Sequence, residues 1–238
     1  MQKRAMNDTA APITVISSMA TRQVLNDLAD VYMQRCGQRV AVESVGGVAA
    51  ARCIEDHEAF DVVVLASDVI ARLAAADLVG AASRVRIARS GIAVAVPAGA
   101  ARPSIDSGAA VREAVLDARS IGYSTGPSGA HLMRLFEHWG IAQMIGPRVV
   151  QAPPGVPVGA LIARGEVELG FQQMSELIGV AGVDIIGPLP EDIQALTIFE
   201  GAVCATAHAP VESRALLAFM GSPECDETKR RYGMEPAR

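Results

Sequence analysis

Small polar residues recur where predicted strands end and the chain turns into the next segment. Five turns share this character, and they contain Ser17, Ser18, Ser44, Gly46, Gly47, Ser67, Asp68, Ser124, Thr125, Ser128, Gly129, Gln172, Gln173 and Ser175. A helix that starts at such a turn presents backbone NH groups without an intrahelical partner and the positive end of its dipole. Several turns of this kind in one place would bind an anion.

Each turn taken alone has a simpler explanation, because serine, threonine and aspartate are common helix N-caps. Five turns distributed over both halves of the chain favour an anion site instead. We therefore assign as candidate substrate-binding residues Ser17, Ser18, Gly46, Gly47, Val48, Ser67, Ser124, Thr125, Ser128, Gly129, Gln172 and Gln173.

Two titratable residues near these turns could move a proton. His131 follows Ser128 by three residues in the first turn of a predicted helix, and imidazole exchanges protons near neutral pH. Glu43, on the strand before Gly46, is the second candidate base. The alternatives are a surface or packing histidine and a solvated strand carboxylate. Glu176 is most simply explained as an acidic residue in the first turn of a helix.

A carboxylate ligand would also use a fixed cation, and the arginine fork matches a carboxylate bidentately. Arg89 immediately precedes a predicted strand over residues 91–96 and is the candidate, with surface pairing as the alternative. Arg22 and Arg52 lie about one turn into predicted helices, where an exposed arginine is the simpler explanation.

Other chemistries lack their residues in this sequence. The remaining histidines have no partners at metal-ligand spacing, and the four cysteines are far apart with no CxxC pair. The GPSGA run at 126–130 is neither a GxSxG nucleophile elbow nor a nucleotide-binding loop. We predict no metal and no cofactor.

Predicted strands alternate with predicted helices along the chain. The strand-like runs are 13–18, 39–43, 61–65, 120–123, 148–150 and 167–172, and most of them lead into segments with helical spacing. This alternation predicts α/β architecture, with mainly parallel sheets and helices on both faces.

Two extended segments, near 85–97 and 196–206, separate two series of these units. We predict that residues 1–88 plus 203–238 form lobe I and that residues 89–202 form an inserted lobe II. Ligands of open α/β sheets bind outside the carboxyl ends of the strands, so the ligand is expected in a cleft between the lobes.

Composition limits the partners. The 238 residues are half hydrophobic and carry 26 acidic against 21 basic side chains, a net charge of −5, which fits a soluble globular protein. The acidic balance and scarcity of aromatic residues exclude a nucleic-acid partner. The longest uncharged run, 149–163, contains three prolines and is shorter than the roughly 20 residues of a spanning helix, so no membrane insertion is expected.

The segment 1–22 lacks the apolar stretch of about 7 to 15 residues that a secretory signal contains. We therefore predict a cytoplasmic location, or a periplasmic one for a mature form whose leader was removed.

Several segments resemble the periplasmic molybdate-binding proteins of ABC importers. They are ISSMATR at 16–22, the turn and helix at 46–54, DVVVLASD at 61–68, PSG at 127–129 and LIARGEVELG at 161–170. The resemblance covers nearly the whole chain and implies the type II periplasmic-binding-protein fold, whose two lobes close on an oxyanion. It places the first binding serine at Ser18 and a backbone NH donor at Ser128.

This sequence departs from that family at two positions. The segment 46–48 offers NH groups but no hydroxyl, and Gln173 replaces a tyrosine. The stretches at 163–177 (ARGEVELGFQQMSEL) and 182–190 (GVDIIGPLP) more closely resemble a branch of the fold that includes aconitate isomerase. That resemblance implies a tricarboxylate ligand and cofactor-free isomerisation of cis- and trans-aconitate.

An allylic proton shift would move the double bond of aconitate. A base, His131 or Glu43, would remove a methylene proton, and NH and OH donors would stabilise the charge that spreads onto a carboxylate. The alternative is a solute-binding protein that delivers a carboxylate, or an oxyanion such as molybdate, to importer membrane subunits. A ligand-sensing module is a third reading, although no helix-turn-helix flanks the lobes.

Overall fold

The structure is a computed structural model that describes residues 11–237. Its contacts divide the chain into two α/β units. Unit 1 contains residues 11–88, 198–231 and 235–237, and unit 2 contains Arg89–Thr197 and Tyr232–Met234. No helix within residues 11–237 has the length and apolar character to cross a bilayer.

A six-stranded sheet with the order β11-β4-β10-β3-β1-β2 forms the centre of unit 1. Its strands are β1 (Ile13–Ser18), β2 (Val40–Val45), β3 (Val62–Ala66), β4 (Val85–Ser90), β10 (Thr197–Val203) and β11 (Glu235–Pro236). β1 runs parallel to both β2 and β3, whereas β10 is antiparallel to β3. The carboxyl ends of the first three strands therefore meet at one edge of the sheet.

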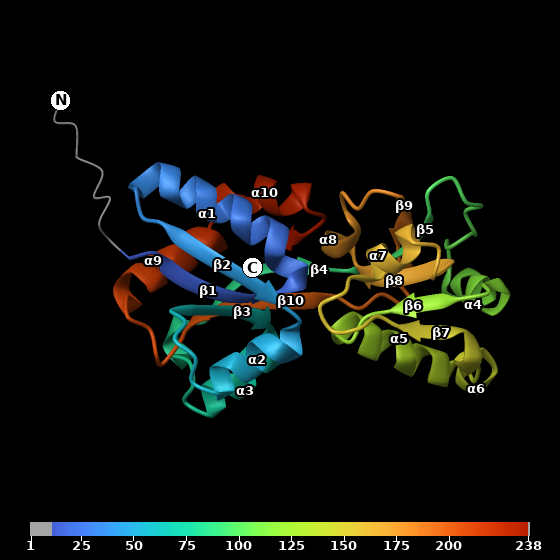
Figure 1. Cartoon of the computed structure of the whole chain (residues 1–238), viewed down its shortest axis with the longest axis horizontal. Helices are drawn as coiled ribbons and strands as arrows, with labels where there is room; N and C mark the ends of the chain where they lie inside the picture. The colour runs from blue at the N-terminus through green and yellow to red at the C-terminus, as the bar shows by residue number, and fades with distance from the viewer. Residues whose placement is uncertain (1–10, 238) are drawn as a thin grey trace. The chain divides into compact units, whose positions relative to one another are not determined.

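Helices cover both faces of this sheet (Figure 1). On one face, α2 (Gly47–Glu55) and α3 (Ser67–Ala75) pack on apolar residues of β1 and β3. On the other face lie α1 (Arg22–Cys36), α9 (Pro210–Gly221) and α10 (Asp226–Arg231). The 3-10 turns are η1 (Met19–Thr21), η2 (Ala81–Ser83) and η4 (Pro223–Cys225). All five residues of β3 are buried, as expected for a strand covered on both faces.

Unit 2 has a five-stranded sheet with the order β7-β6-β8-β5-β9. The strands are β5 (Ile92–Pro97), β6 (Ile121–Tyr123), β7 (Val149–Gln151), β8 (Leu169–Gln173) and β9 (Val183–Pro188). β6 is parallel to β7 and β8, and β5 is antiparallel to β8 and β9.

The alternation of β5 separates the two cores of unit 2. Ile92, Val94 and Val96 face α4 (Gly108–Asp117) and α5 (Pro127–His138), with α6 (Ala142–Ile145) and η3 (Gly146–Arg148) beyond them. Ala93 and Ala95 face α7 (Val158–Ala163) and α8 (Met174–Leu177). Alanine on the second face leaves room for helices to approach the sheet closely.

The predicted α/β alternation is confirmed, and the chain crosses between units in more places than the sequence indicated. The return to unit 1 lies between Thr197 and Ile198, not between 202 and 203, because Phe199 to Val203 pair with β3. The segment Tyr232–Met234 belongs to unit 2, whereas we predicted it in lobe I.

Candidate functional site

Three of the predicted turns lie together where the parallel strands of the unit 1 sheet end. β1, β2 and β3 end at Ser18, Val45 and Ala66, and α2 and α3 start directly after the last two. Neither helix has a side-chain cap at its N-terminus. Their first NH groups therefore remain available to an anion at this edge.

Ser18 and Gly47 are neighbours at this edge. A Cβ atom on Gly47 would lie 3.9 Å from Ser18 Oγ, so the hydroxyl and the start of α2 are adjacent. Ser18 is half-buried, and its Oγ accepts a long hydrogen bond of 3.3 Å from Ala20 N. Gly46 and Ser67 are half-buried at the starts of α2 and α3, and Val48 is exposed.

Two other predicted residues of unit 1 have different surroundings. Ser17 is fully buried, and its Oγ lies 2.8 Å from Ser44 Oγ and donates to the Glu43 carbonyl at 3.4 Å. This hydroxyl therefore ties β1 to β2 within the sheet. The Glu43 residue is exposed on the edge strand β2, three positions before Gly46. We remove Ser17 and Glu43 from the candidate set on these grounds.

The turn before α5 supplies the candidate donors of unit 2. Ser124 Oγ and Ser128 Oγ lie 3.0 Å apart, and Gly126 N donates to Ser124 Oγ at 3.4 Å. A Cβ on Gly129 would lie 1.7 Å from the Ser124 carbonyl oxygen, so only glycine permits this close turn. Ser128 is buried and Thr125 is exposed.

The two glutamines of β8 are buried and make hydrogen bonds within unit 2. Gln172 Oε1 accepts from Gly159 N at 3.4 Å. Gln173, in the amide orientation that satisfies both ends, donates to Ser90 and Gly91 while its oxygen accepts from Thr197 Oγ1 at 2.8 Å. The Gln173 amide thus holds the two strands by which the chain enters and leaves unit 2, which gives it a structural role that the sequence did not predict.

The predicted base His131 is half-buried on α5. Its Nε2 lies 2.9 Å from the Ile193 carbonyl oxygen, which can only accept. Nε2 therefore carries the proton and donates it to the backbone, so this nitrogen cannot take a proton from a ligand. The predicted cation Arg89 is an exposed residue of β4.

Glu176, which the sequence analysis explained as an acidic residue in the first turn of a helix, has a more unusual environment than His131 or Glu43. Glu176 Oε2 accepts from Gln172 Nε2 at 2.6 Å, just after the carboxyl end of β8. Burial raises the pKa of the Glu176 carboxyl to about 7, although the Gln172 hydrogen bond opposes this shift. In the sequence, the spacing of four residues between Gln172 and Glu176 was the signal that these two side chains could form a hydrogen bond.

Within residues 11–237, His, Cys, Asp and Glu do not form a cluster of three or more that could hold a metal ion. The buried thiol of Cys204 has its pKa raised to about 12 by burial and by the nearby Asp61, so it is a packing residue.

A family model described as "Bacterial extracellular solute-binding protein" matches residues 13–235, which is nearly the whole described chain. The protein belongs to this solute-binding family. Among the curated proteins, this solute-binding protein is 34% identical over 232 residues to an aconitate isomerase from Pseudomonas sp. The match covers 94% of this chain and 87% of the relative.

Solved structures confirm the type II periplasmic-binding-protein fold of this family member. The periplasmic molybdate-binding protein of Azotobacter vinelandii matches with a TM-score of 0.80 at 17% identity, over 95% of this chain and 100% of the other. The substrate-binding domain of a putative molybdenum transporter from Clostridium difficile matches with a TM-score of 0.73 at 10% identity, over 96% and 100%. The predicted resemblance to molybdate-binding proteins and to the aconitate isomerase branch is confirmed.

Proposed function

We propose that this solute-binding family member is a cofactor-free isomerase of a small polycarboxylate, acting on aconitate by an allylic proton shift. The observation that carries the proposal is its 34% identity to an aconitate isomerase over 94% of the chain. The similarity extends over nearly the whole length of both proteins, so it is not confined to one unit.

The donors of each unit suit an anionic ligand. In unit 1, Ser18 and the uncapped start of α2 can hydrogen-bond a carboxylate, and in unit 2 the start of α5 with Ser128 can do the same. A donor aimed at developing charge is worth about 3 kcal/mol in the transition state. Arg89, Ser67, Thr125 and the amides of Gly46, Gly47 and Val48 stay proposed ligand contacts.

The chemistry requires only a proton carrier and these donors. Loss of a methylene proton leaves electrons that form a new double bond, while the old double bond shifts and takes up a proton at its far carbon. The charge spreads onto the attached carboxylates in between, where fixed donors stabilise it without reorganisation. No electrons are gained or lost overall.

The second candidate function is a binding protein without chemistry, which delivers a carboxylate or an oxyanion to importer membrane subunits. The family match and the molybdate-binding-protein fold support it. The two functions also differ in location. The isomerase accords with the predicted cytoplasmic location and the binder with a periplasmic one, which fractionation of the producing cells would distinguish.

Proton NMR of the protein with trans-aconitate in deuterated water separates the two functions. An isomerase produces the cis isomer, and solvent deuterium enters the product wherever the transferred proton exchanges with water before it is returned. Binding measured by calorimetry without any appearance of cis-aconitate would overturn the isomerase and support the binder. Molybdate, titrated in the same way, tests the oxyanion alternative.

A further inference from the structure

The Glu176 carboxyl group is held in one orientation by buried residues of unit 2. Gln172 is 1% exposed, and its Nε2 donates to Glu176 Oε2 at 2.6 Å. The other end of the same amide accepts from Gly159 N at the start of α7, which fixes the direction of the donor. The carboxyl therefore has a fixed partner on one oxygen, while Oε1 makes no hydrogen bond with the described residues.

Charged neighbours do not explain the raised pKa of the Glu176 carboxyl. The helix α8 packs against α7, β5, β8 and β9, and these described elements contain one other titratable residue, Asp184 of β9. Asp184 accepts from Gly99 N beyond the end of β5, whereas α8 joins the start of β5 through Met174 N and Gly91 O. Gly233 also packs on Met174, so its neighbour Tyr232 lies close to α8. Tyr232 itself interacts with other groups.

Glu176 follows a strand whose carboxyl end lies at the same sheet edge as the proposed donors of unit 2. β6 and β8 are adjacent and parallel, so the turn after β6 and the residues after β8 lie at one edge of the sheet. The first contains Ser124 and Ser128, and the second contains Glu176. Glu176 is half-buried, so solvent and solutes can still reach part of this residue.

A carboxyl that is neutral and ionised in similar amounts near neutral pH can both take and return a proton. The raised pKa of about 7 gives Glu176 this property. Of the two bases predicted from the sequence, His131 donates its Nε2 proton to the Ile193 carbonyl oxygen, and Glu43 is an exposed residue of the edge strand β2.

We infer that Glu176 is the residue that transfers the proton in the proposed isomerisation and that Gln172 is its positioning residue. The inference rests on the proposed function. The Glu176 carboxylate takes a proton from the methylene carbon, and the electrons of that C–H bond form the new double bond. The electrons of the old double bond then take the proton back from the Glu176 carboxylic acid at the far carbon, which restores the carboxylate.

The variant Glu176→Gln tests this role, because glutamine keeps the size of the side chain and an acceptor for Gln172. We expect isomerisation of trans-aconitate to fall by about a hundredfold or more, the usual contribution of a proton-transfer group. Calorimetry should give a Kd for trans-aconitate within about threefold of the wild-type value. The matched control is Glu168→Gln, at the opposite end of β8, where the carboxylate pairs with Arg119 and a normal rate is expected.

The pH dependence of kcat/KM adds a second test, because a purely structural role of Glu176 would not set its midpoint. The free enzyme must start with ionised Glu176, so kcat/KM should rise with pH through a midpoint near 7. Gln172→Met removes a hydrogen bond that favours the ionised form, so its midpoint should move to higher pH. This second variant also tests the inference if Glu176→Gln does not fold.

The two failures are distinguishable. If the wild-type protein binds trans-aconitate but produces no cis isomer, the proposed function fails and the inference fails with it. If the wild-type protein isomerises and Glu176→Gln keeps its rate within about threefold, or if the Gln172→Met midpoint does not move, only the inference is overturned.

Discussion

Ser17 and Ser18 are adjacent in the chain, yet only one of them is available to a ligand. Ser17 is fully buried with its hydroxyl bonded to Ser44, and Ser18 is half-buried beside the start of α2. Strand alternation sends successive side chains to opposite faces, and Ser18 ends the strand, where the chain turns. The serine-rich turn predicted an anion site at this edge of the sheet, and the tertiary contacts leave the Ser18 hydroxyl as the proposed ligand contact of the two.

Ser18→Ala should weaken trans-aconitate binding by about tenfold to a hundredfold, because a hydrogen bond to a charged group contributes roughly 1.5 to 3 kcal/mol. Calorimetry measures the change in Kd. The matched control is Ser107→Ala, which removes the serine that caps α4 through Ala110 N and should leave the Kd unchanged. Equal Kd values for Ser18→Ala and the wild type would remove Ser18 from the site.

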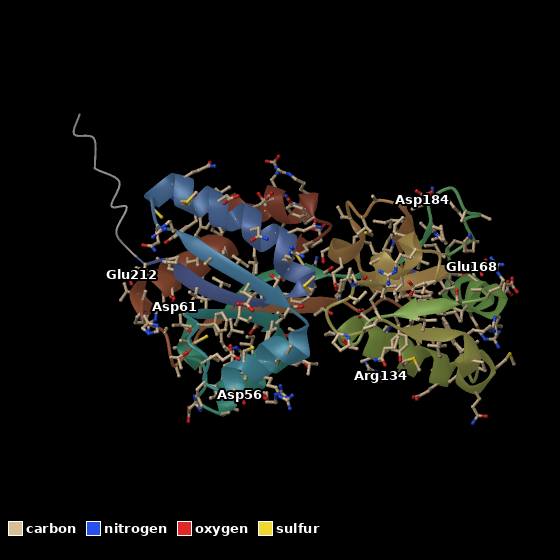
Figure 2. The ribbon with its side chains drawn as sticks, viewed as in Figure 1. Asp56, Asp61, Arg134, Glu168, Asp184 and Glu212 are labelled. Carbon is tan, nitrogen blue, oxygen red and sulfur yellow. The ribbon has the colours of Figure 1, made fainter. Side chains whose placement is uncertain are left out.

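Asp61 directly precedes β3, at the end of the unit 1 strands opposite to Ser18 (Figure 2). Its carboxylate accepts from Thr14 N and Oγ1 at 2.9 Å each, from His208 N at 2.7 Å and from Ala209 N at 3.1 Å. Burial opposes ionisation, but the hydrogen bonds from Thr14, Ala209 and His208 outweigh it and hold the pKa of Asp61 below its usual value. The carboxylate thereby joins β1, β3 and the start of α9.

Asp61→Asn should lower the free energy of unfolding at pH 7 by about 2 to 4 kcal/mol, measured by urea denaturation. A lowered folded-state pKa stabilises the fold above the unfolded value of about 3.9, and this contribution disappears as pH falls through the folded value. The stability gap between the wild type and the variant should therefore narrow below about pH 4. A gap that stays constant down to pH 3 would contradict this assignment.

At the scale of elements, the turn between β6 and α5 depends on a glycine. The STGPSG run at 124–129 predicted a turn that opens a helix, and α5 starts at Pro127 within this run. The reason for Gly129 became visible only in three dimensions, because the turn folds back until a Cβ would overlap the Ser124 carbonyl.

Gly129→Ala should displace the 124–128 turn, lower stability by about 1 to 3 kcal/mol and weaken ligand binding at least tenfold. Thermal denaturation and calorimetry measure the two effects. Gly146→Ala is the control, because a Cβ there meets no atom within 4 Å and the backbone is helical. An unchanged Kd for Gly129→Ala would show that the turn is not part of the site.

At the scale of the whole molecule, the chain passes between its two units several times. The first crossing breaks the predicted extended segment at Gly91 into β4 and β5, which belong to different sheets. Gln173 and Gln194 hydrogen-bond the backbone on either side of this break. The short segment Tyr232–Met234 then returns to unit 2, where Met234 is fully buried.

Met234→Ala should destabilise unit 2 by about 2 to 5 kcal/mol, as expected for a buried large side chain replaced by alanine. Trp139, the single tryptophan, packs near Phe136 in unit 2 and reports its unfolding by fluorescence. Val211→Ala, an exposed position on α9, should leave the transition unchanged. A Met234→Ala transition that coincides with the wild type would contradict the assignment of this segment to unit 2.

Local patterns were enough to predict the strand and helix alternation and the polar turns after the strands, because hydrophobic periodicity and turn chemistry are properties of neighbouring residues. The family was predicted from the resemblance of several segments to known proteins. Partners distant in sequence decided the rest. Ser17 meets Ser44 across 27 positions, and His131 meets Ile193 across 62. Burial and hydrogen-bond partners, which determine whether a hydroxyl is free or a carboxyl holds a proton, arise only when such segments pack together. For that reason the polar turns at the sheet edges were predictable, whereas the environment of Glu176 was decided by the tertiary structure.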